Sequence, residues 1–251
     1  MLKVFWLAAQ KARAEWKNLK LFFFSVQNFL KKKEPLAGKK ALVTAGPTYE
    51  AVDPARFIGN FSSGLMGYSV AEELAKKGAE VTLVSGPSKL SLTYPDIKKT
   101  DVVSAEEMYN AVMKVYEHAD IIIMAAAVAD FTPVHSAKTK IKKSDTFTAI
   151  QLKPTKDILA TVGKNKRRNQ ILVGFALETD NEIKNAARKL NTKNLDFIVL
   201  NTLKDKGAGF GTATNKITII DRNNKITKFD LKPKTDVAKD IVNKIIQLIK
   251  K

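Results

Sequence analysis

Short runs of aliphatic and β-branched residues alternate with helical patterns along most of the chain, and this alternation limits the possible folds more than any other feature. The predicted strands are 40–44, 80–84, 98–103, 120–124, 149–152, 171–175, 197–200, 216–220 and 226–229. The predicted helices are about 67–77, 157–162, 182–190 and 237–249, with another that starts at Ser104. Repeated strand–helix units build a parallel sheet with helices on both faces, because their crossovers are right-handed. The pattern therefore predicts an α/β, Rossmann-like, mainly parallel sheet, with a terminal hairpin around the turn at 222–224.

The first 37 residues differ from the rest of the chain in composition. Residues 1–40 contain ten Lys or Arg and two Glu, so they hold +8 of the formal net charge of +18. We predict two parts, a basic and aromatic extension at 1–37 and a folded domain at 38–251. The extension is a linker remnant, a natural N-terminus or an amphipathic helix on a membrane surface. Membrane contact by residues 1–33 is the disfavoured alternative.

Cysteine is absent and histidine is scarce, which excludes several kinds of chemistry. Without Cys the chain forms no disulfide, thiolate zinc site or Cys nucleophile, and it suits a reducing cytoplasm, which is the predicted location. The chain has only two histidines, His118 and His135, so a His-based metal cluster or a Ser-His-Asp triad is disfavoured. Most lysines beyond residue 40 are scattered as on solvated helix faces, so no nucleic-acid binding is predicted. No apolar run reaches 18 residues, so no membrane-spanning helix is expected.

Residues 42–67 run from a strand, through a loop rich in Gly, Pro, Ser and Asn, to the start of a helix. Sheets of this class commonly bind phosphate groups at such a place, beside the helix N-terminus. The hydroxyl of Ser62 can cap the helix, and Gly64 and Gly67 let backbone N–H groups approach an anion, although a plain capped helix fits equally well. Asn60 carries an amide that can bind an oxyanion, or it is only a turn residue.

The same loop fails the test for a dinucleotide site. The first strand is not followed by G-x-G-x-x-G, and the second strand ends in Val84-Ser85-Gly86-Pro87 without the acidic residue that would bind a ribose. An NAD(P)-dependent oxidoreductase on a Rossmann-like fold is therefore the less favoured alternative.

Six motifs follow one another in a specific order along the predicted domain. The chain reads TAGPT at 44–48, SSG at 62–64, AAAVAD at 125–130, KIKK at 140–143, TKDIL at 155–159 and GFALET at 174–179. Together they resemble the phosphopantothenoylcysteine synthetase family over about residues 38–250. The chain departs from the family at Lys156, which replaces a Pro, so we expect a looser nucleotide-contacting turn that keeps Asp157.

The resemblance implies a ligase of coenzyme A biosynthesis that condenses 4′-phosphopantothenate with L-cysteine. In bacterial members the carboxylate attacks the α-phosphate of CTP, which gives an acyl-cytidylate and pyrophosphate, and the cysteine amine then displaces CMP. Mg²⁺ is expected with the triphosphate, near Asp130. No flavin is expected in this chain, because residues 1–37 are too short for the decarboxylase that bifunctional members carry upstream. Both steps build negative charge on oxygen, so the site should offer positive charge and amides rather than a strong base.

The resemblance also implies roles for individual residues. Asn60 and Lys140 are expected to be catalytic, Asn60 at the acyl intermediate and Lys140 at the triphosphate. Lys142 and Lys143 belong to a flap that closes over the intermediate. Substrate contacts are expected from Arg56, Asn60 and Ala126. Nucleotide contacts are expected from Ser62, Ser63, Gly64, Ala125, Ala126, Asp130, Lys140, Lys156, Asp157, Ile158, Leu159, Phe175, Lys189 and Lys193.

Three of these expectations concern contacts that a structure can show. Arg56 either pairs with the pantothenate phosphate or holds its loop. Lys189 and Lys193 share a helix face and would repel one another unless an anion bridges them. Family members are homodimers with shared active sites, so a β flap or hairpin is expected to serve both dimerisation and active-site closure. Asn60 and Lys140 can then belong to the pockets of different subunits.

Overall fold

The computed structural model describes residues 34–143, 149–202, 209 and 211–250. The expectations for residues 1–33 lie outside the described residues. Leu36 is fully buried in the core, so the folded domain includes the residues just before the predicted start at 38. No described helix is long and apolar enough to cross a membrane.

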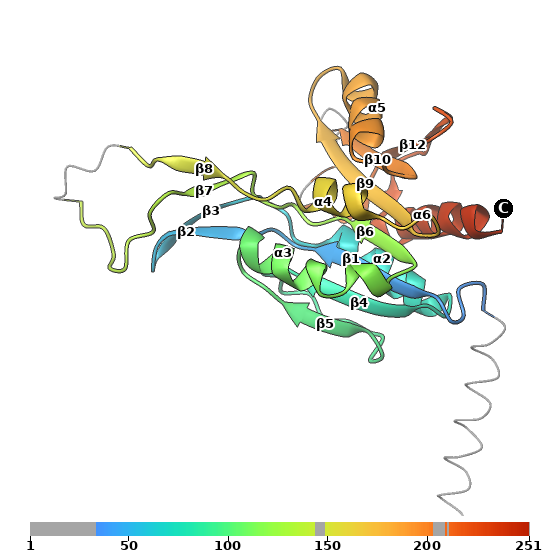
Figure 1. Cartoon of the computed structure of the whole chain (residues 1–251), viewed down its shortest axis with the longest axis horizontal. Coiled ribbons are helices and arrows are strands. Elements are labelled where there is room, and N and C mark those ends of the chain that lie inside the picture. Colours follow the sequence, from blue (N-terminus) through green and yellow to red (C-terminus); the bar gives the residue numbers. More distant parts are fainter. Residues whose placement is uncertain (1–33, 144–148, 203–208, 210, 251) are drawn as a thin grey trace, which may run out of the picture.

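An eight-stranded sheet in the order β13-β12-β10-β9-β6-β1-β4-β5 forms the centre of the domain (Figure 1). Its strands are β1 (Lys40–Ala45), β4 (Glu80–Ser85), β5 (Lys98–Asp101), β6 (Ile121–Met124), β9 (Ile171–Glu178), β10 (Phe197–Thr202), β12 (Ile217–Asp221) and β13 (Ile226–Lys228). All neighbours from β5 to β10 are parallel, and β12 and β13 add an antiparallel hairpin. The predicted parallel sheet and terminal hairpin are both confirmed.

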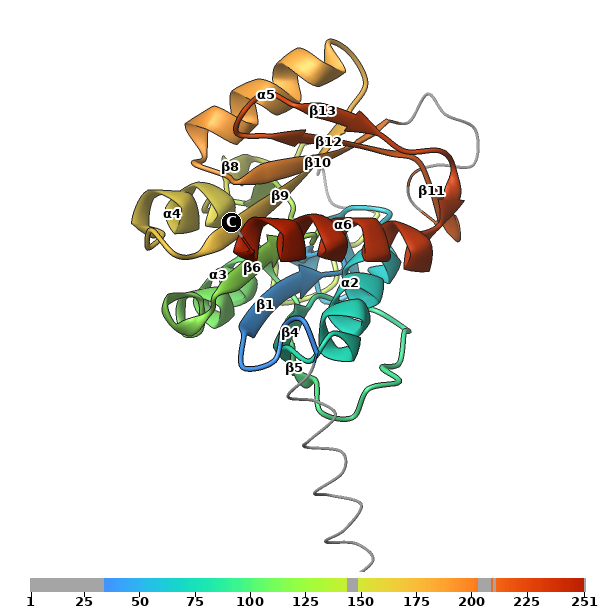
Figure 2. The same cartoon turned by 90° about the vertical axis from the view of Figure 1, so that its right-hand side faces the viewer.

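Helices cover both faces of this sheet (Figure 2). One face carries α2 (Leu65–Lys76) and α6 (Lys234–Ile249), and the other carries α3 (Ala105–Met113), α4 (Ile158–Asn165) and α5 (Glu182–Thr192). A short 3₁₀ helix, η1 (Tyr116–His118), precedes β6. Adjacent residues of a strand serve opposite layers, because side chains alternate along it: Val43 packs with α2 and α6, and Leu42 with α3 and α4. Central strands buried on both faces are therefore continuously apolar, as in Ile121–Met124.

Two hairpins project from the sheet and together form what we call the arm. They are β2 (Tyr49–Asp53) with β3 (Arg56–Gly59), and β7 (Phe131–Pro133) with β8 (Leu152–Pro154). Figure 1 shows them extending side by side away from the helices. Asp53 joins the two hairpins, because its carboxylate accepts the N–H groups of Arg56 and Ile141. The hydrogen bond from the Arg56 side chain is the main reason why the pKa of Asp53 falls to about 2.

Several details of the predicted elements differ from the structure. Residues 49–59 were expected as loop and form the β2–β3 hairpin, because Asp53 fixes the intervening turn through the N–H groups of Ala55 and Arg56. The strand expected at 149–152 begins only at Leu152, where pairing with β7 starts. Helix α6 begins one turn earlier than expected. The short pair β11 (Thr214–Asn215) and β14 (Lys232–Pro233) was not predicted.

Candidate active site at the carboxyl ends of the parallel strands

The loops that follow β1 and β6 are bonded to each other. Ala127 donates its N–H to the carbonyl of Gly46 (2.9 Å), and Ala129 donates to the hydroxyl of Thr48 (2.9 Å). Gly46 has a φ of +78°, and a Cβ there would lie 2.9 Å from the carbonyl oxygen of Gly86. Only glycine fits so close to that neighbouring loop. The two hydrogen bonds join the TAGPT and AAAVAD motifs into one structural unit.

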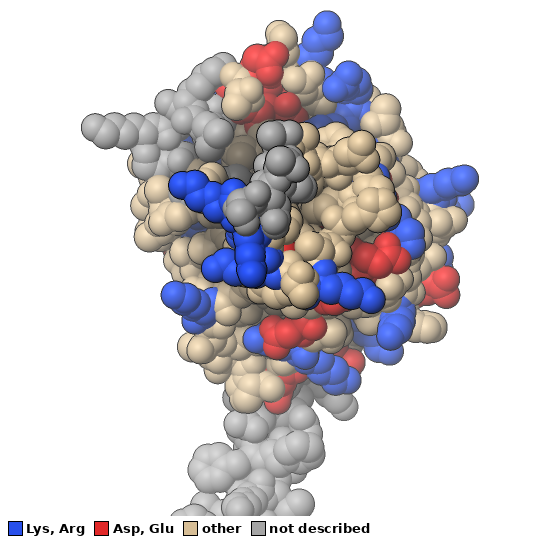
Figure 3. Space-filling model, turned by 90° about the vertical axis from the view of Figure 1, so that its left-hand side faces the viewer, with Lys and Arg blue, Asp and Glu red and all other residues tan. Residues whose placement is uncertain are grey.

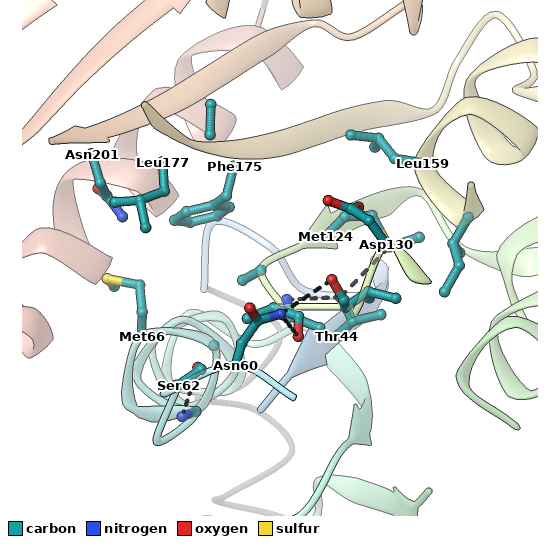
Figure 4. Close-up of a pocket in the computed structure, with 18 of the residues that line it drawn as sticks. Thr44, Asn60, Ser62, Met66, Met124, Asp130, Leu159, Phe175, Leu177 and Asn201 are labelled. Atoms are coloured by element: carbon teal, nitrogen blue, oxygen red, sulfur yellow. Dashed lines mark hydrogen bonds between the residues drawn. The ribbon is translucent and has the colours of Figure 1, made fainter. Parts of the chain in front are cut away.

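This unit borders a cavity of about 530 Å³ at the carboxyl ends of the parallel strands (Figure 4). Parallel α/β sheets usually bind ligands at this edge. Of the predicted site residues, the cavity is lined by Asn60, Ser62, Ser63, Gly64, Ala125, Ala126, Asp130, Lys156, Asp157, Ile158, Leu159, Phe175, Lys189 and Lys193. In Figure 4, Phe175 and Leu177 of β9 point toward Asn60 and Met66 across the cavity.

The start of α2 differs from the predicted serine cap. Its N-cap is Gly64, in the left-handed region at φ +85°, and no side chain caps the helix. The hydroxyls of Ser62 and Ser63 instead accept the N–H groups of Gly64 (3.2 Å), the N-cap, and of Leu65 (3.4 Å), the first residue of the helix. A Cβ at Gly67 would lie 2.5 Å from the Cβ of Ala45, so that glycine is required for packing of α2 on β1.

Asn60 lies exposed between the arm and the cavity. Its amide nitrogen donates to the carbonyls of Ala127 (2.9 Å) and Val128 (3.3 Å), as the dashed lines in Figure 4 show. These bonds fix the side chain against the loop that follows β6. An amide held in this way is preorganised for contact with a ligand in the cavity.

Asp130 places a carboxylate at the same edge of the sheet. Among the described residues, no hydrogen bond or ion pair is recorded for its side chain, while its main-chain carbonyl accepts the N–H of Thr155 (2.9 Å). The described residues contain no group of three or more His, Cys, Asp or Glu that could hold a metal ion. A single carboxylate suits Mg²⁺, which keeps several waters and is completed by substrate phosphates.

Lys189 and Lys193 each have a carboxylate partner, which the sequence prediction did not include. They are not an unpaired couple that needs an anion, because Lys189 pairs with Glu178 (2.7 Å) and Lys193 with Asp157 (2.8 Å). Strand β9 continues three residues beyond the predicted end at 175, which brings Glu178 beside α5. Burial alone would raise the pKa of Asp157. The hydrogen bonds from Lys193 and from the N–H of Ala160, together with the positive charges of Lys193 and Lys189, outweigh burial, so the pKa is lowered.

Lys156 also has a carboxylate partner. Its ammonium lies 2.7 Å from Glu106 of α3 and 4.7 Å from the ring centre of Tyr109. The pKa of Lys156 is raised chiefly by the hydrogen bond to Glu106. The residue that replaces the family's Pro therefore ties the turn before α4 to α3.

The basic residues of the arm lie outside the cavity of their own chain. Lys140, Lys142 and Lys143 are exposed on the segment between β7 and β8. Figure 3, which views the molecule from the arm side, shows blue side chains around this end. The guanidinium of Arg56 pairs with Asp53 and donates to the carbonyl of Ile141 (2.7 Å). Of the two expectations for Arg56, the structure shows the loop-holding contact.

Several residues that line the cavity were not among the predicted site residues, and Asn201, Asn215 and Lys234 are three of them. Asn201 at the end of β10 accepts the amide N–H of Asn215 (3.1 Å), and both line the cavity. Lys234, the first residue of α6, is only 5% exposed and donates to the carbonyls of Gly209 (3.0 Å) and Thr212 (2.7 Å). Burial lowers the pKa of Lys234. None of these residues lies in the six motifs, and the predicted helix at 237–249 leaves Lys234 outside it, so the sequence carries no clear signal for them.

The fold and the cavity define an α/β domain with a ligand site at the carboxyl ends of its parallel strands, built from backbone amides, Asn side chains and Lys side chains. The chain belongs to the family described as "DNA/pantothenate metabolism flavoprotein C-terminal domain", whose model matches residues 36–249. The predicted resemblance to phosphopantothenoylcysteine synthetase domains is thereby confirmed at the level of the family.

Individual relatives agree with this assignment. A protein named cysteine/cysteine sulfinic acid decarboxylase, from an unknown prokaryotic organism, is 54% identical over 227 residues, which are 90% of this chain and 63% of that protein. The coenzyme A biosynthesis bifunctional protein CoaBC of Bacillus subtilis is 45% identical over 216 residues, 86% of this chain and 53% of that protein. The crystal structure of the C-terminal domain of a CoaBC protein superposes with a TM-score of 0.74 at 37% identity, and covers 87% of this chain and 99% of that chain. The chain thus spans less than two thirds of the length of these two curated relatives.

Proposed function

We propose that this protein is a CTP-dependent ligase that joins 4′-phosphopantothenate to L-cysteine, through an acyl-cytidylate, and releases pyrophosphate and CMP. One observation carries the proposal: motifs far apart in sequence converge on one cavity that offers amides and charge. The described residues that line it include no His or Cys. Such a site suits acyl activation, in which negative charge develops on oxygen and no strong base is needed. The motif resemblance supplies the substrates, and the names of the CoaBC relatives, which place those proteins in coenzyme A biosynthesis, agree with it.

In this proposal, different parts of the cavity bind the nucleotide and the acyl group. Phe175 and the residues at the start of α2 and α4 hold the nucleotide, which leaves its α-phosphate near the loop after β6. The Asn60 amide, fixed on the carbonyls of Ala127 and Val128, then contacts the acyl group and assists attack by the cysteine amine. No electron transfer occurs in either step, so the proposal includes no flavin.

Mg²⁺ is part of the proposal as the partner of the triphosphate. Asp130 is the residue that would hold it, because its carboxylate lines the cavity and a single carboxylate plus phosphates suits this ion. When bound, Mg²⁺ would neutralise phosphate charge. The remaining positive charge must come from lysines.

We also propose a homodimer with shared active sites. Lys140 lies outside its own chain's cavity, so its proposed role requires a second copy. The arm and its base carry large exposed apolar side chains, namely Phe57, Phe61, Phe131, Ile150 and Leu152. Phe61 is 92% exposed, which is costly for a side chain in water and favours burial against another surface. A second arm related by a two-fold axis would provide such a surface.

The test is pyrophosphate release when the protein is mixed with CTP, Mg²⁺ and 4′-phosphopantothenate, followed by formation of CMP and the amide when cysteine is added. A parallel reaction with ATP in place of CTP shows which nucleotide base is preferred. A reaction with NADPH and a carbonyl substrate tests the oxidoreductase alternative. A reaction with cysteine or cysteine sulfinate, in which CO₂ is measured, tests the decarboxylase activity that the name of one relative states. Hydride transfer or CO₂ release without pyrophosphate would refute the ligase.

A further inference from the structure

The structure assigns a ligand-binding role to Lys234: we propose that its ammonium binds a phosphate group of a substrate in the cavity. The residue begins α6 and lines the cavity beside Asn215. The inference rests on the proposed function for the identity of the substrates, but not for the presence of an anion.

The lysines that line the cavity differ in their partners. Lys156, Lys189 and Lys193 each lie within 2.8 Å of a carboxylate oxygen. Lys234 is the most buried of the four, yet both of its recorded partners are neutral carbonyls. Among the cavity lysines that the structure describes, the charge of Lys234 is thus the one with no recorded ion pair.

The charge of Lys234 also occupies an unfavourable position on its helix. A cation in the first turn faces the positive end of the helix dipole, which is unfavourable. Asp236 lies in the same turn, but its carboxylate pairs with Lys239 (2.7 Å) on the outer surface. Burial in turn lowers the pKa of Lys234. A buried ammonium in this position costs free energy in the empty protein, and an anion in the adjacent cavity would offset that cost.

The ammonium of Lys234 has three N–H groups. Two of them are used by Gly209 and Thr212, and the main-chain N–H of Lys234 bonds to Ala213 (3.0 Å). These bonds hold the side chain in one direction and leave one donor. Because Lys234 lines the cavity, we infer that this donor can contact a phosphate oxygen there.

A phosphate can come from the nucleotide or from phosphopantothenate, and the experiment separates the two. We would measure the binding of CTP against cytidine, and of 4′-phosphopantothenate against pantothenate, by calorimetry with wild type and Lys234→Met. The variant keeps the length of the stem but removes the charge. We expect it to weaken one phosphorylated ligand by about 10- to 100-fold, the range for a lost hydrogen bond to a charged group, and to leave the matching unphosphorylated ligand unchanged.

Lys239→Met is the matched control, because it removes an exposed charge from the same helix, and it should leave all four affinities unchanged. Equal losses for both members of a pair would show that Lys234 only shapes the loop, and no loss at all would also overturn the inference. If the Met variant does not fold, wild type soaked with CTP or 4′-phosphopantothenate must place a phosphate oxygen within about 3 Å of Lys234 Nζ; a longer distance in both complexes overturns the inference.

Inorganic tripolyphosphate separates this inference from the proposed function. Wild type that binds tripolyphosphate, with weaker binding by Lys234→Met, supports the anion role even if neither substrate is used. Wild type that binds substrates normally, with an unaltered Lys234→Met variant, leaves the proposed function standing and removes the inference.

Discussion

At the scale of single residues, Asn60 has a structural contact and a proposed chemical role that can be separated. Its amide holds two carbonyls of the loop after β6, and we propose that it also assists amide formation. We expect Asn60→Ala to release pyrophosphate at close to the wild-type rate but to slow formation of the amide by about 10²- to 10³-fold, the usual cost of losing one such donor. Rapid-quench single-turnover assays with labelled CTP would measure both steps.

Asn165 provides a control for this experiment, because its amide also donates to a backbone carbonyl, that of Thr161 (2.9 Å), but at the far end of α4. Asn165→Ala should leave both steps unchanged. If Asn60→Ala slows both steps equally, its contact with the loop is what matters, and the chemical role is refuted.

Asp157 combines a helix cap with an ion pair, and two substitutions distinguish them. Its carboxylate accepts the N–H of Ala160 (2.8 Å) as the N-cap of α4 and also pairs with Lys193. Asn caps helices about as well as Asp, whereas Ala does not, so Asp157→Ala should lower the free energy of unfolding by about 1 kcal/mol and Asp157→Asn by much less. Urea unfolding would measure both. Equal losses would mean that the ion pair, not the cap, provides the stability.

Prediction of the site from sequence depended on whether a residue belongs to a motif. Asn60, Asp130 and Phe175 could be selected because their neighbours in sequence were recognisable, and the structure brings all three to one cavity. The pairing of Lys189 with Glu178 was missed, because the length of β9 decides it. Lys234 was missed because its importance arises from burial, which helix periodicity at 237–249 does not reveal for the first residue of the helix.

At the scale of the elements, the arm depends on the charge of Asp53. Its folded pKa of about 2 lies below the ordinary 3.8, so its contribution to stability is present above pH 3.8 and is lost as the pH falls toward 2. We expect the arm to loosen in that window before the sheet does, as seen by NMR titration of the Asp53 carboxyl and by hydrogen exchange of β2 and β3 relative to α6. Asp53→Asn should remove this pH dependence and make the arm more sensitive to protease at neutral pH. A titration midpoint near 3.8 would contradict the prediction.

Helix α2 is positioned by Gly67, and Gly67→Ala tests how tightly. Alanine favours a helix over glycine by about 0.5–1 kcal/mol. Its Cβ, however, would lie 2.5 Å from the Cβ of Ala45 and 3.0 Å from the carbonyl oxygen of Thr44. Overpacking of this kind costs about 1–3 kcal/mol, so we expect a net loss in thermal unfolding and weaker CTP binding, because the start of α2 lines the cavity. A more stable variant would show that α2 can shift freely.

The parallel sheet could be predicted because each buried strand is a continuous apolar run with a helix after it. The β2–β3 hairpin could not, since Asp53-Pro54-Ala55-Arg56 looks like a loop until Asp53 is seen to bind Ile141, 88 residues away. Local patterns identify elements that sheet burial stabilises, whereas elements held by distant polar contacts need the structure.

At the scale of the whole molecule, the arm raises the question of how Lys140 reaches an active site. It is exposed and outside its own chain's cavity, and the apolar surface nearby includes Phe61 and Phe131. We expect Phe61→Asp to shift the protein toward monomer in analytical ultracentrifugation, because a charge there opposes burial against a second copy. Lys153→Asp, on the exposed strand β8, tests whether any added acid on the arm has that effect. A Phe61→Asp protein with unchanged mass would contradict the proposed interface.

Shared sites make a prediction that no single-chain site can satisfy. As homodimers, the Asn60→Ala and Lys140→Ala proteins should each form the amide product at only a small fraction of the wild-type rate. In a mixed dimer, however, the chain with intact Asn60 provides a cavity and its partner provides intact Lys140, so that one of the two sites is complete. Equal amounts of the two variants, unfolded and refolded together, should recover about a quarter of the wild-type rate, because half of the dimers are mixed in a two-fold assembly. Steady-state formation of the amide product would measure the recovery, and the variants refolded separately and then combined provide the baseline. If Lys140 served its own chain's cavity, neither site of a mixed dimer would be complete and the activity would stay at that baseline.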